Sequence, residues 1–108
     1  MIITLHSLIR EGREPDYDRE HRVIPDDLAA EFARIGIHDW TIWRAGRHLF
    51  HRVECDDWET ALAALAESPA DARWQQHIGQ IVDHFDPAGP DGSPAPMPQV
   101  WSLSDQVS

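Results

Sequence analysis

The sequence predicts an α+β domain in which helices cover one face of an antiparallel sheet. Three observations predict this class. Residues 2–9 are β-branched and apolar, residues 37–44 and 48–55 alternate around a tight turn, and the segments between and after them repeat apolar residues at helical spacing. The chain has 108 residues, which is enough for one hydrophobic core and too few for two. We therefore expect a single domain over residues 1–108.

The first strand and helix are expected within the first 36 residues. Residues 2–9, "IITLHSLI", end at the polar run "REGRE". A helical face follows, formed by Tyr17, His21, Ile24, Leu28, Phe32 and Ile35. Pro25 cannot donate a backbone hydrogen bond, so the helix should kink or restart there, with Asp26 and Asp27 favouring the new N-terminus. Gly36 is expected to end it.

The second half of the chain predicts a hairpin, two helical segments and a final strand. Asp56 is suited to cap a helix through "WETALAALAES", and a second helix is expected over "DARWQQHIGQIVDHF". Residues 86–97 form a Pro/Gly-rich connection without periodicity, and "QVWSL" is the expected last strand. The order is therefore β-α-β-β-α-β with the second helical segment split in two, which is the ferredoxin-like arrangement.

A sheet covered on one side leaves its other face open, and here neither face is polar. Within residues 37–44, one face has His38, Trp40, Ile42 and Arg44, and the other has Ile37, Asp39, Thr41 and Trp43. Such a composition is not that of a plain solvent face. We therefore expect the open face to be covered by a second copy of the chain, sheet to sheet, in a homodimer.

The charge of the chain argues against polyanionic partners. Its net charge is −10, from 19 acidic residues against 9 lysines and arginines, and there is no basic run. Nucleic acids and anionic membranes attract clustered positive charge, so we expect neither as a partner. The lone Cys55 excludes an internal disulfide, no basic leader precedes the first strand, and no apolar run approaches the roughly 20 residues of a bilayer span. We expect a cytoplasmic protein with a small neutral ligand.

Metal and cofactor chemistry is not indicated by the motifs. His48 and His51 are three apart in a predicted strand and should point to opposite faces, while His77 and His84 lie about 10 Å apart along a helix at the usual ~1.5 Å rise. No HExxH, P-loop, GxSxG or dinucleotide glycine pattern occurs. Cys55 lies on the core side of its strand and is expected to be a small core residue. We expect no metal and no cofactor.

Tyr17 and His21 leave two interpretations open. They are four residues apart on the face directed toward the sheet, so both side chains point inward. One interpretation is a partly buried pair that completes the core, which is the commoner use of such residues. The other is an acid–base pair, since imidazole both gives and takes a proton near neutral pH and a phenol donates a hydrogen bond.

Five tryptophans are the second unusual feature of a chain this short. Trp58 is expected to be an ordinary core residue of an amphipathic helix. Trp40 and Trp74 are placed to face a pocket over the sheet. An indole face packs well against the C–H-rich face of a sugar, and its N–H is expected to serve a sugar hydroxyl. A neutral polyhydroxylated ligand also suits the acidic chain.

The quoted motifs together resemble the L-rhamnose mutarotase family. The segments that carry the resemblance are "YDREHRVIPDDL", "GIHDWTIWR", "LFHRVECDDW", "RWQQHI" and "VWSL", in order and with matching gaps. The resemblance implies a dimeric α/β-barrel fold and interconversion of the α and β anomers of a 6-deoxyhexose without metal or cofactor. It also implies that His21 is the proton donor and that Tyr17, Trp40, Trp74 and Gln75 bind the substrate.

The sequence departs from the family pattern at two of these positions. Trp40 stands where the rhamnose enzymes often have tyrosine, and Gln75 replaces the second of two consecutive tryptophans. L-fucose is therefore kept beside L-rhamnose as the expected sugar. Two other function classes stay open: a non-catalytic sugar-binding or regulatory module of the same fold, and a cofactor-free monooxygenase of the dimeric α/β-barrel type.

Overall fold

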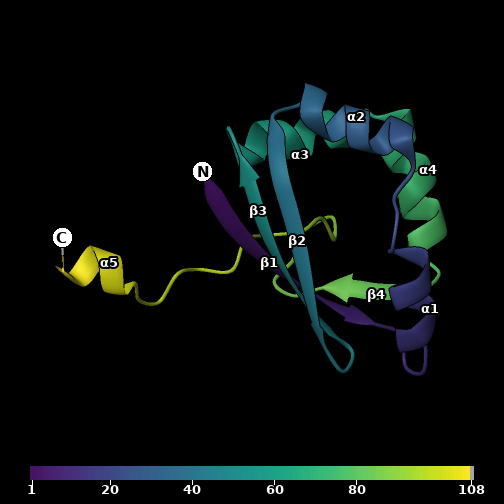
Figure 1. Ribbon diagram of the computed structural model, residues 1–108, viewed down its shortest axis with the longest axis horizontal. Helices are drawn as coiled ribbons and strands as arrows, with labels where there is room; N and C mark the ends of the chain where they lie inside the picture. The colour runs from purple at the N-terminus through teal and green to yellow at the C-terminus, as the bar shows by residue number, and fades with distance from the viewer. Residues whose placement is uncertain (108) are drawn as a thin grey trace.

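The computed structural model describes residues 1–107 and has a four-stranded antiparallel sheet in the order β2-β3-β1-β4. The helices lie on one side of this sheet and bend with it into a ring, from which the C-terminal arm extends (Figure 1). The elements in chain order are β1 (Ile2–Ile9), α1 (Glu14–Glu20), α2 (Asp26–Arg34), β2 (Ile37–Ala45), β3 (His48–Cys55), α3 (Trp58–Ala66), α4 (Pro69–Ile78), β4 (Val82–Phe85) and α5 (Leu103–Val107). The predicted α+β class is confirmed. None of the helices within residues 1–107 reaches the length and apolarity that a bilayer crossing needs.

The covered face of the sheet is set by strand alternation. On β1 and β3, the side chains of alternate residues are buried: Leu5, Ser7, Ile9, Leu49, His51, Val53 and Cys55. In β2, a register shift between Ile37 and Asp39 places Ile37 in the core with Trp40. The prediction that Ile37 shares a face with Trp43 is therefore wrong, because the bulge inserts one residue into the alternation.

The break in the first helical segment lies where the sequence predicts it. The α1 helix ends at Glu20, and α2 restarts at Asp26 directly after Pro25. Gly36 follows α2 with a φ of +87°. A methyl group on Gly36 would lie 2.7 Å from the Asp56 carboxylate and would make that side chain shift, so the positive φ is the main reason for glycine here.

The cap of α3 differs from the prediction by one residue. Asp57 accepts a hydrogen bond from the Thr60 N–H at 2.9 Å. Asp56 instead hydrogen-bonds the His38 ring at 2.6 Å. The reason is that the backbone of Asp56 still donates to the Gly36 carbonyl, so the chain leaves the hairpin one residue later than predicted.

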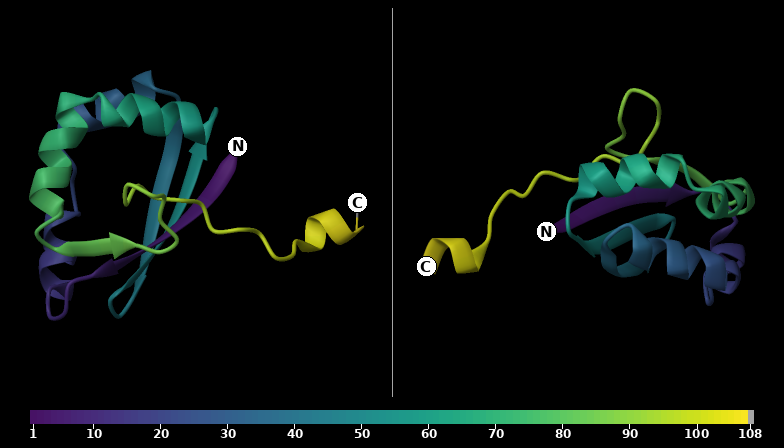
Figure 2. Two further views of the ribbon diagram at one scale, coloured as in Figure 1. Left: turned by 180° about the vertical axis from the view of Figure 1, so that it is seen from behind. Right: turned by 90° about the horizontal axis from the view of Figure 1, so that it is seen from above.

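The last strand is not where the sequence predicts it. Residues 82–85, expected to be helical, form β4 and pair with β1, with Ser7 opposite Phe85. Residues 99–102 belong to no strand, and Val100 and Trp101 are exposed on an arm that extends away from the body (Figure 2). A short apolar segment fits helix and strand alike. Here α4 ends at Ile78 with Gly79 as its C-cap, and Val82–Phe85 pair with the free edge of β1.

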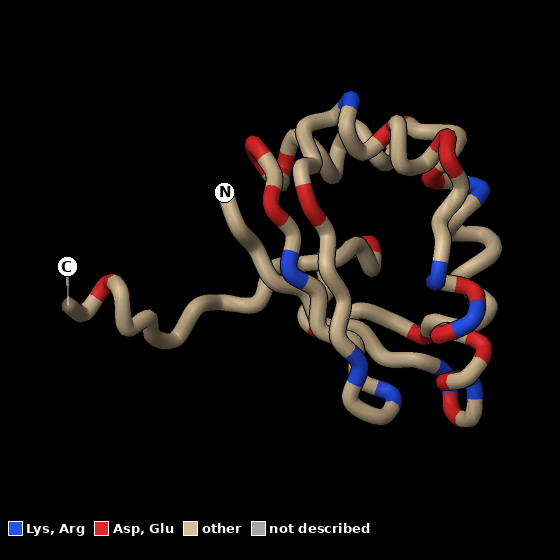
Figure 3. The backbone as a smooth tube through the Cα atoms, in the orientation of Figure 1, with Lys and Arg blue, Asp and Glu red and all other residues tan. Residues whose placement is uncertain are grey.

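Ion pairs connect the first helix to the rest of the domain. Arg44, in β2, donates two hydrogen bonds of 2.8 and 2.7 Å to Asp18 on α1. Glu20 at the end of α1 lies 3.1 Å from the His77 ring on α4. Figure 3 shows that acidic and basic residues alternate along this side of the molecule. These contacts fix α1 between the sheet and α4, which matters because α1 bears Tyr17.

Candidate functional site

A cavity of about 640 Å³ lies between the inner face of the sheet and the helices. This volume is in the range of small-molecule binding sites. Its walls are largely aromatic, from Tyr17, Phe32, Trp40, Trp58, Trp74 and Phe85. Polar lining comes from Ser7, His51, Glu59, Asp71, Gln75 and the loop Asp91–Pro94, which overlaps part of the ring in the rear view (Figure 2). Four of the five predicted site residues, namely Tyr17, Trp40, Trp74 and Gln75, line this cavity.

The fifth predicted residue, His21, adjoins the cavity without lining it. It is the C-cap of α1, and its ring centroid lies 5.1 Å from that of Tyr17. Its ring also meets Trp74 edge-on at 5.2 Å. His21 faces a second cavity of about 610 Å³, whose walls share Phe32, Trp40 and Trp74 with the first. His21 thus contacts Tyr17 and Trp74, which line the main cavity, and it lines the neighbouring cavity itself.

Burial influences the charge states of His21 and Tyr17. His21 is half-buried, and burial lowers its pKa below the usual value, while a hydrogen bond with its own backbone acts in the opposite direction. Tyr17 is 6% exposed, and burial together with the Asp18 carboxylate raises its pKa well above the usual range. At neutral pH the site therefore contains a neutral phenol, which donates a hydrogen bond, next to an imidazole suited to proton transfer.

Trp40 takes part in a buried hydrogen-bond chain. Its indole N–H donates to Nδ1 of His51 at 3.1 Å, and Nε2 of His51 lies 2.9 Å from the hydroxyl of Ser7. The prediction that the N–H of Trp40 serves a sugar hydroxyl is therefore wrong in this structure. The ring is still a cavity wall, stacked on Phe32 with centroids 5.5 Å apart.

Trp74 and Gln75 stand next to each other on α4 with different exposure. Trp74 is buried and contacts His21, whereas Gln75 is exposed at the cavity edge. The amide of Gln75 donates to Asp71 at 3.4 Å. Burial raises the pKa of Asp71, and the bond from Gln75 acts against that rise. Gln75 thus adds a polar group at the rim and contacts a carboxyl that also lines the cavity.

Two buried polar residues of the cavity were missed from the sequence, because Ser7 and His51 were not predicted as site residues. Trp58 is a core residue as predicted, and it also lines the cavity. A signal for His51 was present, since it alternates with Leu49 and Val53 on the core side of β3. No local signal marks Ser7, because its role depends on the strand that pairs beside it.

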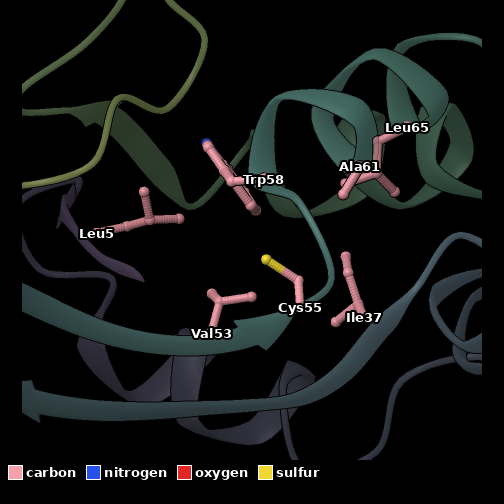
Figure 4. Close-up of a cluster of buried hydrophobic side chains, with 7 residues drawn as sticks. All are labelled: Leu5, Ile37, Val53, Cys55, Trp58, Ala61 and Leu65. Atoms are coloured by element: carbon pink, nitrogen blue, oxygen red, sulfur yellow. The ribbon is translucent and has the colours of Figure 1, made fainter. Parts of the chain in front are cut away.

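The first histidine pair lies as its spacing predicts, whereas the prediction that His77 and His84 lie along one helix is wrong, because His84 belongs to β4. His51 is buried on the inner face, while His48 is exposed on the outer face and hydrogen-bonds His6 at 2.9 Å. Cys55 is buried in the apolar cluster with Ile37 and Trp58 (Figure 4), which confirms its prediction as a core residue. Within residues 1–107, no three histidine, cysteine or acidic side chains are grouped so that they could hold a metal ion.

Comparison with known proteins identifies the family. The family model described as L-rhamnose mutarotase matches residues 2–103. An L-rhamnose mutarotase of Opitutus terrae is 36% identical over 99 residues, covering 88% of this chain and 90% of the relative. One of Cronobacter sakazakii is 36% identical over 81 residues, covering 73% of each.

Solved structures show the same fold at lower identity. The crystal structure of an L-rhamnose mutarotase from Formosa agariphila has a TM-score of 0.73 at 17% identity, covering 95% of this chain and 98% of that one. A putative antibiotic biosynthesis monooxygenase from Bordetella bronchiseptica has a TM-score of 0.61 at 16% identity, covering 94% and 96%. The family model and the two 36% identical relatives are decisive: the chain belongs to the L-rhamnose mutarotase family.

Proposed function

We propose that this protein interconverts the α and β anomers of L-rhamnose, with His21 as the group that transfers the proton. One observation supports this most directly. The ring of His21 contacts Tyr17 and Trp74, and both of these line an aromatic cavity large enough for a monosaccharide. The chain's membership of the mutarotase family makes this arrangement the candidate active site of a sugar isomerase.

The chemistry needs one proton donor and one proton acceptor. The proton of the anomeric hydroxyl leaves O1, the ring oxygen O5 gains a proton, and the C1–O5 bond breaks to give an open-chain aldehyde. Rotation about the C1–C2 bond followed by the reverse transfers gives the other anomer. No electrons pass to another molecule. A neutral imidazole at His21 accepts the proton that leaves O1 and delivers it to O5 as the C1–O5 bond breaks, and the same transfers run in reverse on ring closure. The phenol of Tyr17 polarises a sugar oxygen.

The aromatic walls suit a 6-deoxyhexose. Trp40 and Trp74 offer flat apolar surface to the C–H groups of the ring, and the apolar remainder of the cavity accepts the methyl group at C6. Gln75 and Asp71 at the rim add hydrogen-bonding groups for hydroxyls. A cavity of this composition binds a neutral, amphipathic ligand better than an ionic one.

An anomer-exchange assay by NMR saturation transfer tests the proposal. L-Rhamnose, L-fucose and further aldoses are each compared with and without the protein at one pH. We expect exchange above the spontaneous rate, greatest for L-rhamnose. Binding of L-rhamnose with exchange at the spontaneous rate would instead identify a sugar-binding module, and oxygen uptake with an aromatic substrate would identify a monooxygenase.

We also propose that the protein is a cytoplasmic homodimer that pairs through the outer face of the sheet. This face exposes Trp43 at 55% and Phe50 at 41%, and the Phe50 ring stacks with His48 and packs at a tilt against His6. Gel filtration with multi-angle light scattering tests the dimer. Phe50→Asp should shift the mass to that of a monomer, while Gln76→Asp on exposed α4 should leave it unchanged. A monomeric wild type would contradict the proposal.

A further inference from the structure

The cavity floor contains two hydrogen-bond donors that the proposed chemistry does not use. Trp58 is 4% exposed, and its Nε1 has no hydrogen-bond partner among residues 1–107. The nitrogen lies at the end of the ring directed away from Cys55 and Val53 (Figure 4). Trp58 is one of the residues that line the cavity, and its nitrogen is buried. A buried N–H without an acceptor is unfavourable, which makes it a candidate contact for a ligand oxygen.

The hydroxyl of Ser7 is the second donor, and its orientation follows from its neighbours. The N–H of Trp40 donates to Nδ1 of His51, so a neutral His51 has its proton on Nε2. That proton is donated to Ser7, whose oxygen lies 2.9 Å away. The Ser7 oxygen is thus an acceptor in this bond, and its own proton is available for another group. Ser7 lines the cavity, and His51 is its one hydrogen-bond partner among the described residues.

The two donors flank one aromatic wall. Trp40 meets the His51 ring and the Trp58 ring, both at 6.0 Å between centroids and both edge-on. Trp40 thus contacts Trp58 directly, and it is linked to Ser7 through His51. Both donors require acceptor oxygens, such as those of sugar hydroxyls, and disfavour a methyl group.

We propose that Ser7 and Trp58 form a donor pair that hydrogen-bonds two oxygens of the bound sugar, and that His51 is a positioning residue that holds the Ser7 hydroxyl in its donating orientation. This rests on the proposed function, since it takes the cavity to bind a monosaccharide. It adds a specificity rule: the polar, hydroxyl-bearing edge of the sugar faces the cavity floor, and the C6 methyl faces away from it. His51 does not take the substrate proton, because both of its nitrogens are already bonded.

Binding measurements with single-atom changes on both partners test the donor pair. Ser7→Ala and Trp58→Phe each remove one donor, and the dissociation constant is measured for L-rhamnose and for its 2-, 3- and 4-deoxy analogues. We expect each variant to bind L-rhamnose about 3- to 10-fold more weakly, the range of one buried neutral hydrogen bond. One of the deoxy analogues should lack the hydroxyl that a given donor bonds. The variant without that donor should bind this analogue as tightly as the wild type does.

The analogues separate a lost hydrogen bond from lost packing. A packing defect in Trp58→Phe would weaken all four sugars by the same factor and would overturn the role of Trp58. Ser102→Ala and Trp101→Phe make the same chemical changes on the exposed arm and should leave binding unchanged. Measurements on wild type with the analogues alone keep the test valid if a variant does not fold.

The positioning role of His51 needs a readout of its own. His51→Gln keeps an acceptor for Trp40 and a donor for Ser7, whereas His51→Phe keeps ring volume and loses both. We expect His51→Gln to bind L-rhamnose within about twofold of wild type and His51→Phe to match Ser7→Ala. Adding His51→Phe to Ser7→Ala should give no further loss. Additive losses would show that His51 acts independently of Ser7 and would overturn its positioning role.

The outcomes also distinguish this inference from the proposed function. In one outcome, the wild type accelerates anomer exchange, and Ser7→Ala and Trp58→Phe bind every sugar as tightly as the wild type does. This result would overturn the donor pair alone. In the other outcome, the wild type leaves anomer exchange at the spontaneous rate, and both variants bind L-rhamnose more weakly in the expected pattern. This result would support the donor pair and overturn the proposed catalysis.

Discussion

Two histidines beside the same cavity differ in their hydrogen bonds, and that difference separates their roles. His51 lies in the middle of the sheet, 6% exposed, with one nitrogen bonded to Trp40 and the other to Ser7. His21 lies at the end of a seven-residue helix, half-buried, between Tyr17 and Trp74. Burial lowers the pKa of both.

The comparison shows that burial alone does not make an imidazole a proton carrier. Burial, with smaller contributions from His21 and His6, lowers the pKa of His51 to about 4, so it stays neutral across the physiological range. Its nitrogens have no free position for a substrate proton. Among the described residues, the ring of His21 packs against the rings of Tyr17 and Trp74, and it lines the neighbouring cavity, from which a ligand can approach it. Of the two, His21 has the properties of a general acid–base group.

The largest expected effect comes from removing the imidazole of His21. His21→Asn should reduce the acceleration of L-rhamnose anomer exchange by on the order of 10²–10⁴, the usual contribution of general acid–base catalysis. Sugar affinity should change little. Saturation-transfer NMR measures the rate, and ligand-observed NMR measures binding. His84→Asn, at an exposed histidine that lines neither cavity, is the matched control and should retain activity. Full exchange in His21→Asn would place the proton transfer elsewhere.

The second-largest expected effect is the pH dependence of stability, and it arises from His51. Because its native pKa of about 4 lies below the ordinary 6.5, the unfolded chain binds more protons between these values. The free energy of unfolding should therefore rise with pH from 4 to 6.5 and level off above, by about 3 kcal/mol at most. Urea unfolding of wild type and His51→Gln at pH 7 and pH 5 measures this. We expect a smaller pH dependence in His51→Gln, and equal dependences would show that His51 does not contribute.

The smallest effect is expected at the rim of the cavity. Gln75→Trp restores the aromatic pair of the family pattern and adds apolar surface beside Trp74. We expect L-rhamnose to bind about two- to fivefold more tightly, the size of one partly exposed aromatic contact. Titration followed by tryptophan fluorescence measures it. Gln76→Trp places the same ring at an exposed position that does not line the cavity, and it should bind as wild type does. Equal gains in both variants would remove Gln75 from the site.

Most of the first 60 residues were predictable because their patterns are local. The β1 strand, the hairpin, the restart after Pro25 and the inward direction of Tyr17 follow from spacings of two, three and four residues. The cavity residues on the helices were also within reach of such reasoning. The substrate-binding roles of Tyr17, Trp40, Trp74 and Gln75 remain predictions, and the experiments above test them.

The features that the sequence did not determine depend on segments far apart in the chain. Residues 82–85 are a strand because β1 has a free edge, and the helical spacing of Ile81 and Phe85 gave no sign of it. The bond from His51 to Ser7 depends on the register that sets β1 beside β3, 44 residues away. The open N–H of Trp58 depends on what packs around its ring.

By itself, the amino-acid sequence determined the class of fold, the family and the face on which Tyr17 and His21 lie. These rest on periodicity and motif spacing, which are properties of neighbouring residues. Tertiary structure alone decided which histidine is bonded at both nitrogens and which keeps one open to the cavities. The physical reason is that a buried polar group takes the partner that strand pairing brings to it, and that partner is encoded elsewhere in the chain.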